Sequence, residues 1–165
     1  MNARLRRWSS CKAEQASKIA GNSLLPEIKL VDWYYSEKEL SEIRTAVFIQ
    51  EQHVPPELEW DGLDHAALHL LACNADGEAL GCARILSGGV IGRMAVLAPW
   101  RGSGVGMALL CKALQVCRER GWRDIRLSAQ IHAIPFYEKA GFVVCSEAYL
   151  DAGIPHRDMR MAAPE

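Results

Sequence analysis

The stretch VLAPWRGSGVGMALL, from Val96 to Leu110, joins an apolar strand-like run to an apolar helix-like run. Between the two runs stand a proline, Arg101 and three glycines at every second position, Gly102, Gly104 and Gly106. Glycine allows backbone conformations and close approaches that a side chain forbids. The stretch therefore predicts a strand, a glycine-lined turn and a helix, in that order.

Two common nucleotide-binding loops do not fit this turn. It has no Gly-Lys-Ser/Thr ending, which a Walker A loop needs, and its glycines do not follow the G-x-G-x-x-G spacing. It does present free N–H groups at a helix start, where the helix dipole favours an anion. Arg101 adds a positive charge beside them. Spacing alone leaves two interpretations open, a phosphate-sized anion site and a plain strand–helix turn.

Composition indicates an ordinary globular protein. The chain has 165 residues, of which 50% are hydrophobic and 24% charged, and its formal net charge is −1. This length predicts one domain with a genuine core, and this charge argues against nucleic acid as the main partner. No apolar run approaches the ~20 residues that span a membrane. The six cysteines have no metal-ligand spacing, so we expect reduced thiols and a cytoplasmic location.

Residues 1–25 differ from the rest of the chain. They carry five basic residues against one acidic residue and lack sustained periodicity. We interpret residues 1–25 as a flexible basic leader, with a transit peptide as the alternative. Residues 26–165 are expected to form the domain.

The remaining pattern alternates strands and helices without an internal repeat, and three strands in the middle are joined by short turns. This order predicts a mixed α/β fold with a mostly antiparallel central sheet flanked by helices. The expected strands are 27–35, 66–74, 78–86, 90–97, 124–130, 141–150 and 156–162, and the expected helices are 36–50, 104–120 and 132–140.

Two motifs together resemble the GNAT acyltransferases. Arg101, Gly104 and Gly106 fill the pattern R/Q-x-x-G-x-G/A of motif A, and AIPFYEKAGF at 133–142 resembles motif B. The resemblance spans roughly residues 27–163 and implies the GNAT fold. Two further segments, VFIQEQHVPPELEWDGLD and DAGIPHRDM, are similar in sequence to the ElaA-like branch of this family.

The resemblance implies acetyl transfer from acetyl-CoA to a primary amine, by direct attack in a ternary complex. It gives Tyr137 the position of the general acid that protonates the CoA sulfur. At the position where many members have asparagine, this chain has Gln130. The residues that it assigns to CoA are Met94, Ala95, Val96, Arg101, Gly102, Ser103, Gly104, Val105, Gly106, Gln130 and Phe136. Without the motif, we would interpret Phe136 and Tyr137 as core aromatic residues of an amphipathic helix.

Acidic residues gather between the first helix and the next strand. Glu51, Glu57, Glu59, Asp61 and Asp64 fall within 14 residues. A mouth of this charge would attract a cationic amine, although such runs are commonly solvated loops. Glu51 is the leading candidate for the base, and Glu59 and Asp64 are candidates for binding the acceptor. His132 is a further acceptor candidate, and His156 in GIPHRDM is a candidate for contacting substrate or relaying a proton. The histidine spacing predicts no metal site.

Two other functions stay open. Arg44, Phe48, Trp60, Asp61, Asp64 and Arg84 resemble positions of the acyl-homoserine-lactone synthases, which share the fold. A non-catalytic CoA-binding sensor of the same fold is the other alternative. The expected partners are a small-molecule or peptide amine, neither nucleic acid nor membrane, and a second copy of the chain, because many GNAT members dimerise.

Overall fold

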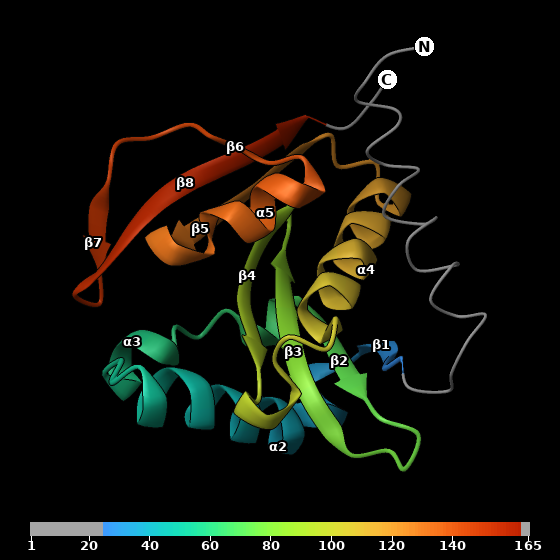
Figure 1. The fold of residues 1–165 in the computed structure, drawn as a ribbon. Coiled ribbons are helices and arrows are strands. Elements are labelled where there is room, and N and C mark those ends of the chain that lie inside the picture. The colour runs from blue at the N-terminus through green and yellow to red at the C-terminus, as the bar shows by residue number, and fades with distance from the viewer. Residues whose placement is uncertain (1–24, 163–165) are drawn as a thin grey trace.

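The computed structural model describes residues 25–162, which form one open mixed sheet with helices on both faces (Figure 1). The sheet has eight strands in the order β1-β2-β3-β4-β5-β8-β6, and β7 pairs with β8. The strands are β1 Glu27–Val31, β2 Leu68–Cys73, β3 Ala79–Leu86, β4 Val90–Val96, β5 Asp124–Gln130, β6 Val143–Val144, β7 Tyr149–Asp151 and β8 Ile154–Ala162. The main helices are α2 Trp33–Arg44, α3 Pro56–Glu59, α4 Val105–Glu119 and α5 Ile134–Ala140. This is the predicted fold class.

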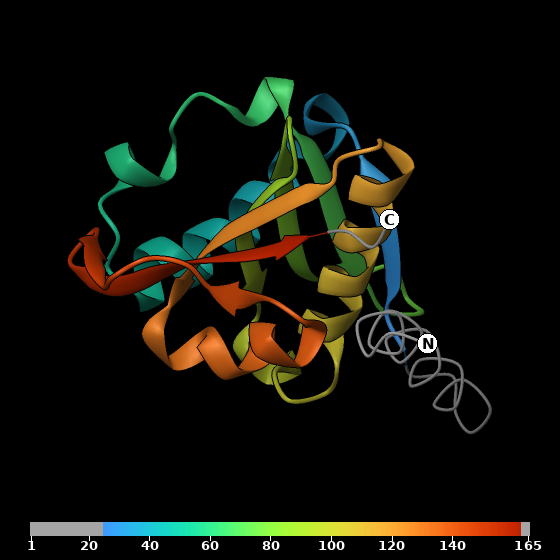
Figure 2. The same cartoon turned by 90° about the horizontal axis from the view of Figure 1, so that it is seen from above.

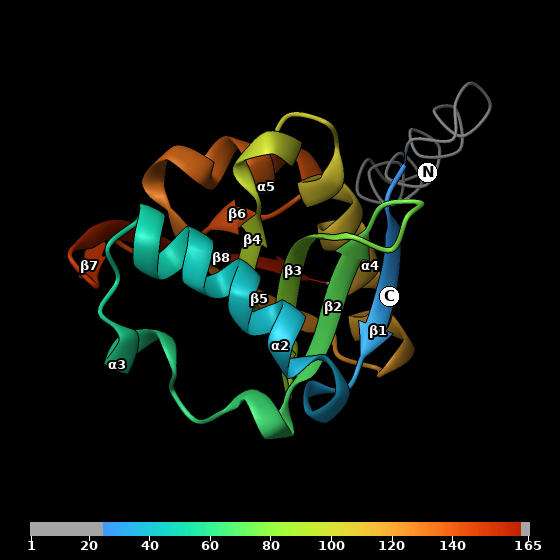
Figure 3. The ribbon, with the colours of Figure 1, turned by 90° about the horizontal axis from the view of Figure 1, so that it is seen from below.

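Two apolar layers hold the helices on the sheet, because successive side chains of a strand point to opposite faces. Leu70 and Ala72 of β2 pack in the core that includes α4, whereas Leu71 and Cys73 pack with Trp33, Leu40 and Ile43 of α2. Figure 3 shows α2 lying across the strands with α4 on their other side. The sheet is thus buried on both faces at its centre.

Strands β4 and β5 pair at one end only. They are the one parallel pair among the described strands, and their register contains a single pair, Val90 with Arg126. Farther along β4, the pairing with β3 shifts register, and Arg93 has a φ of 47°. A bulge of this kind bends a strand and redirects its side chains. Figures 1 and 2 show the two strands diverging beyond this point, so Met94 to Val96 face an opening instead of β5.

The structure corrects several expected boundaries. Strand β1 ends at Val31 and α2 begins at Trp33, because the Asp32 carboxylate accepts a hydrogen bond from the Tyr34 N–H at 2.8 Å and caps the helix there. After α2 the chain continues as a π-helical segment, Thr45–Glu51. The expected strand at 141–150 is instead two short strands, β6 and β7.

Three other expectations concern the cysteines, the N-terminal residues and membrane-spanning segments. Cys73, Cys82, Cys117 and Cys145 are free thiols, but Cys111 is disulfide-bonded, so the expectation of reduced thiols is wrong there. The predicted leader, residues 1–25, lies outside the described residues except for Leu25. In the described part of the chain, every helix is too short or too polar to cross a bilayer.

Candidate functional site

A cleft of about 640 Å³ follows β4 through the opening between β4 and β5. The walls come from the π-helical segment, α3, β4, β5, α5 and the β7–β8 turn. The cleft thus collects residues from both ends of the chain. It includes most residues that the sequence singled out: Glu51, Glu59, Met94, Ala95, Val96, Arg101, Gln130, His132 and Tyr137.

The glycine turn forms the start of α4. Gly102 and Gly104 have φ values of 74° and 93°, a conformation that side chains disfavour, and a Cβ on either would meet no atom within 4 Å. Gly104 caps α4, and no side chain caps its first N–H groups. A Cβ on Gly106 would lie 3.5 Å from the Phe136 ring. The turn therefore exposes backbone donors to open space and packs closely against α5.

Arg101 and Glu51 form an ion pair at this end of the cleft. Two guanidinium nitrogens of Arg101 donate to the two carboxylate oxygens of Glu51 at 2.6 and 2.8 Å, and Nε donates to the Val96 carbonyl at 2.9 Å. The hydrogen bond from Arg101 lowers the pKa of the Glu51 carboxyl. Glu51 is a weak base in this arrangement, and its predicted catalytic role requires Arg101 to turn away.

Tyr137 of α5 lines the same cleft. Its OH is 3.8 Å from the Met94 sulfur, and its ring makes edge contacts with Phe136 and Phe142. Burial raises the pKa of Tyr137 to about 12. A half-buried phenol with this pKa keeps its proton at neutral pH and can donate it, as a general acid must.

Gln130 and His132 mark the end of β5 in the same cleft. The Gln130 side-chain amide donates to the Gln52 side-chain oxygen at 2.9 Å. His132 lies on a single 3₁₀ turn, Ile131–Ala133, and also lines the cleft. The structure therefore brings together Gln130, His132 and Tyr137, three residues that the sequence had placed in the site.

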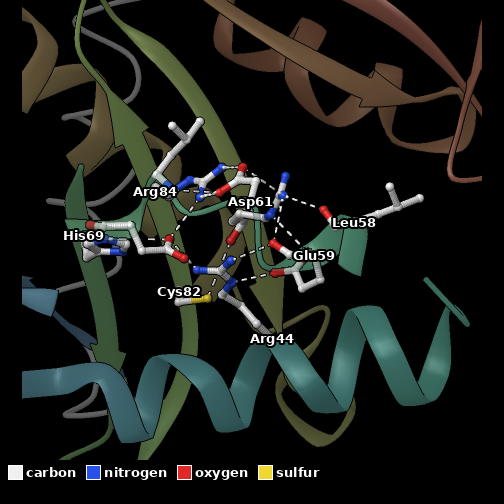
Figure 4. A network of polar contacts seen from close by, with 10 residues as sticks. Arg44, Leu58, Glu59, Asp61, His69, Cys82 and Arg84 are labelled. Carbon is white, nitrogen blue, oxygen red and sulfur yellow. Dashed lines mark hydrogen bonds and ion pairs between the residues drawn. The ribbon is translucent and has the colours of Figure 1, made fainter. Parts of the chain in front are cut away.

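The acidic residues of the α3 loop join a buried charge cluster, defined here as Arg44, Glu59, Asp61, Asp64, Arg84 and Arg93 (Figure 4). Arg44 contacts Glu59 at 2.5 Å and Asp64 at 2.6 Å, and Arg84 contacts Asp61 at 2.6 Å and Asp64 at 3.0 Å. Arg93, at the β4 bulge, has its Nε 3.0 Å from a Glu59 oxygen. Three cations and three carboxylates thus compensate one another.

This cluster changes the interpretation of two predicted acceptor residues. Glu59 is 3% exposed and Asp64 is 5% exposed, and both carboxylates contact arginines. Asp64 is also absent from the cleft lining. Within the acidic run, Glu59 and Asp64 are therefore not solvated, whereas Glu51 and Glu57 are exposed. An acceptor role for Glu59 and Asp64 stays a prediction. Four residues that carried the resemblance to the lactone synthases have a structural role in this cluster, through ion pairs with one another. They are Arg44, Asp61, Asp64 and Arg84.

The wall formed by β5, β8 and β7 holds His156, which the sequence offered as a substrate contact or proton relay, together with polar residues that the sequence did not place in the site. Tyr149 donates to Asp158 at 2.5 Å, and its hydroxyl also contacts Ser128. His156 stacks on Tyr149 with ring centroids 6.2 Å apart. Ser128, His156 and Asp151 line the cleft. Asp151 and His156 belong to the DAGIPHRDM segment, which did not indicate that β8 would pair with β5.

Comparison with known proteins identifies the class. A family model described as acetyltransferase (GNAT) domain matches residues 32–163. The chain is 36% identical to an acyl-CoA N-acyltransferase from Pseudomonas aeruginosa, with a TM-score of 0.73 over 83% of this chain and 99% of that one. The chain belongs to the GNAT acetyltransferase family, and it is an acyltransferase.

Its relatives also define the branch. The chain is 35% identical to Protein ElaA of Escherichia coli over 147 residues, 80% of this chain and 95% of that protein. The crystal structure of Escherichia coli ElaA aligns with a TM-score of 0.73 and 33% identity, over 81% of this chain and 98% of that chain. The uncharacterized N-acetyltransferase YjcF of Bacillus subtilis is 41% identical over 123 residues, 71% of this chain and 86% of that protein. The ElaA-like assignment is confirmed.

Proposed function

We propose that this chain transfers an acetyl group from acetyl-CoA to a primary amine by direct attack in a ternary complex. The observation that carries the proposal is the separation of β4 from β5, beside a cleft that Met94 to Val96, Arg101 and Tyr137 line. The glycine turn follows Arg101 directly in the chain. A long, narrow donor with an anionic end and a reactive thioester end fits this shape.

The residues at the glycine turn fit the pyrophosphate of CoA. Gly102 and Gly104 leave open space where side chains would otherwise stand, and α4 begins there without a side-chain cap. Backbone N–H groups at a helix start bind phosphate oxygens well. Arg101 adds a guanidinium group once Glu51 releases it. Val105 and Ser103 contribute backbone groups, while Gly106 and Phe136 keep α5 close to the turn.

The β4 backbone and Tyr137 supply the remaining chemistry. Met94 to Val96 lack a β5 partner, so the backbone groups there that do not pair with β3 or Arg101 can pair with the pantetheine amides and polarise the thioester carbonyl. Tyr137 donates its proton to the departing sulfur. Glu51 as the base stays a prediction, and the same is true of the cytoplasmic location, the homodimer and the boundaries 1–25 and 26–165.

Calorimetric titration of acetyl-CoA into wild type, Gly104→Glu and Gly121→Glu tests this proposal. Both glycines have positive φ values, 93° and 73°, and open space around a Cβ. They stand at opposite ends of α4, so the two variants carry similar backbone strain but place the carboxylate differently.

We expect wild type and Gly121→Glu to bind acetyl-CoA and Gly104→Glu to lose binding, because its carboxylate repels the pyrophosphate. Unchanged binding in Gly104→Glu would place the donor elsewhere. Absence of binding to wild type would remove the acetyltransferase function and leave the glycines as a turn.

A further inference from the structure

His156 is a buried histidine on the wall of the cleft that β5, β8 and β7 form. It lies on β8 opposite Gln130 of β5, is 9% exposed and lines the cleft. Its ring stacks on Tyr149, which fixes the plane of the imidazole. The turn between β7 and β8 and the helix α3 both line the cleft. Both lie at the same end of the molecule in Figures 1 and 3.

The backbone determines which nitrogen of His156 carries the proton. Nδ1 lies 2.7 Å from the Ile154 carbonyl oxygen. A carbonyl can only accept a hydrogen bond, so Nδ1 must donate. In the neutral ring Nε2 then keeps its lone pair, and Nε2 has no hydrogen bond within residues 25–162. His156 therefore offers an unpartnered proton acceptor to the cleft.

The carboxylates that line the cleft are nearly all occupied by arginines. Glu51 pairs with Arg101, and Glu59 and Asp61 belong to the buried charge cluster. Arg84 lowers the pKa of Asp61, the opposite of what a base near neutral pH needs. Asp151 differs, because within the described residues no ion pair or hydrogen bond reaches its side chain.

Asp151 and His156 lie on neighbouring strands of one hairpin. Tyr149 pairs with His156, and Asp151 is two residues farther along β7, so it shares the Tyr149 face at ~7 Å along the strand. A tight turn holds Asp151 there, since Ala152 and Gly153 have φ values of 50° and 76°. An unpaired carboxylate thus stands near the unpartnered imidazole nitrogen.

We propose that His156 is the general base for a cationic acceptor amine and that Asp151 pairs with a second positive charge on that acceptor. This assignment rests on the proposed acetyl transfer. The acceptor ammonium gives one proton to Nε2 of His156, and the neutral nitrogen forms the N–C bond as it attacks the thioester carbonyl. When the C–S bond breaks, the sulfur takes the Tyr137 proton. The nitrogen then loses its second proton, which restores Tyr137, and His156 releases its proton to solvent.

Titratable and charged groups surround His156 on several elements of the cleft. Tyr149 and Asp151 come from β7, and Asp158 is two residues farther along β8. The other titratable or charged residues that line the cleft are Glu51, Glu59, Asp61, Arg84, Arg93, Arg101, His132 and Tyr137. Because the arginines offset the carboxylates opposite, Asp151 is the lining carboxylate left to stabilise a cation beside His156.

Two substitutions separate catalysis from hydrogen bonding at this position. His156→Asn keeps an amide N–H near Nδ1 that can donate to Ile154, whereas His156→Gln reaches toward the Nε2 position. Each variant is assayed with an alkyl diamine, which is protonated at the assay pH, and with an arylamine, which is neutral. Calorimetry with acetyl-CoA and thermal unfolding accompany the kinetics. His65→Gln, an exposed histidine outside the cleft, is the matched control.

We expect both His156 variants to lose about 100-fold or more in kcat/KM with the diamine and less than about tenfold with the arylamine, because only the diamine must be deprotonated before attack. Acetyl-CoA affinity and the His65→Gln kinetics should match wild type. Recovery of diamine activity in His156→Asn, or equal losses with both amines, would overturn the proposal. Failure of wild type to bind acetyl-CoA would refute the acetyltransferase function first.

Asp151→Asn tests the second contact. We expect KM for the diamine to rise about tenfold, the loss of one charge pair, while KM for the uncharged arylamine stays unchanged. Equal changes in both KM values would overturn the role of Asp151.

Discussion

Replacing Asp64 by asparagine removes a buried negative charge that two arginines share. One oxygen of Asp64 contacts Arg44 at 2.6 Å and Arg84 at 3.0 Å, and its side chain is 7% exposed. Arg44 is 1% exposed and lies over the Trp60 ring at 4.6 Å, so it cannot turn to solvent. The substitution preserves shape and leaves the charge of two buried guanidinium groups incompletely balanced.

The expected loss of stability is large. An ion pair at 4 Å contributes about 4 kcal/mol at an effective dielectric constant of about 20, and Asp64 makes two such pairs. Desolvation of the carboxylate offsets part of this gain, and removing one partner of a buried pair typically costs about 3–5 kcal/mol. The asparagine oxygen still accepts one hydrogen bond, so we expect about 3 kcal/mol. For a domain of this size, that lowers Tm by about 6–12 °C.

Urea and thermal unfolding measure the effect, with Asp124→Asn as the control. Asp124 also pairs with two arginines, Arg126 and Arg160, but at the surface. Exposed pairs contribute little, so this variant should unfold with the wild-type midpoint. A loss below about 1 kcal/mol in Asp64→Asn would refute the reasoning that the cluster is buried and charge-balanced. A selective rise in the acceptor KM without loss of stability would instead restore Asp64 as an acceptor residue.

Three further outcomes are expected. Gly81→Ala would place a Cβ 2.6 Å from the Ala95 carbonyl oxygen, so unfolding should show a loss of about 1–3 kcal/mol, whereas Gly92→Ala, with no atom within 4 Å, should be neutral in the same experiment. Tyr137→Phe should lower kcat by about 10²–10⁴-fold in kinetic assays, and the affinity for acetyl-CoA measured by calorimetry should stay unchanged. Arg84 lowers the pKa of Asp61, so its stabilising contribution is complete above the unfolded pKa of about 3.9 and is lost as pH falls toward the folded value. Urea titrations from about pH 5 to pH 2.5 should therefore give a shallower loss of stability for Asp61→Asn than for wild type.

Local sequence predicted much of the fold and one end of the site. The glycine spacing after Val96 indicated the turn and α4, because a positive φ restricts the residue type at Gly104. Short strand-like runs separated by the turns ADG and SGG indicated β2 to β4. The start of α2 was missed because Asp32 competes as a cap with the Ser36 signature, and burial of Trp33 favours the earlier start.

Contacts between residues far apart in the sequence could not be predicted from local patterns. Glu59 and Asp64 read as an exposed acidic loop because their partner Arg44 lies 15 and 20 residues away. His156 lies 26 residues beyond Gln130, yet β8 pairs it directly with that residue. No periodicity or spacing records which charges become neighbours when distant strands pair.

By itself, the sequence determined the mixed α/β class, the glycine turn at the start of a helix and the helical position of Tyr137, because propensity, capping and backbone freedom act over a few residues. Only the tertiary structure decided that β4 separates from β5 and that Arg101 pairs with Glu51. It also decided that three arginines form ion pairs with the carboxylates of the acidic loop. Those outcomes depend on burial and on charges brought within 4 Å by long-range pairing, and both arise only when the whole sheet has assembled.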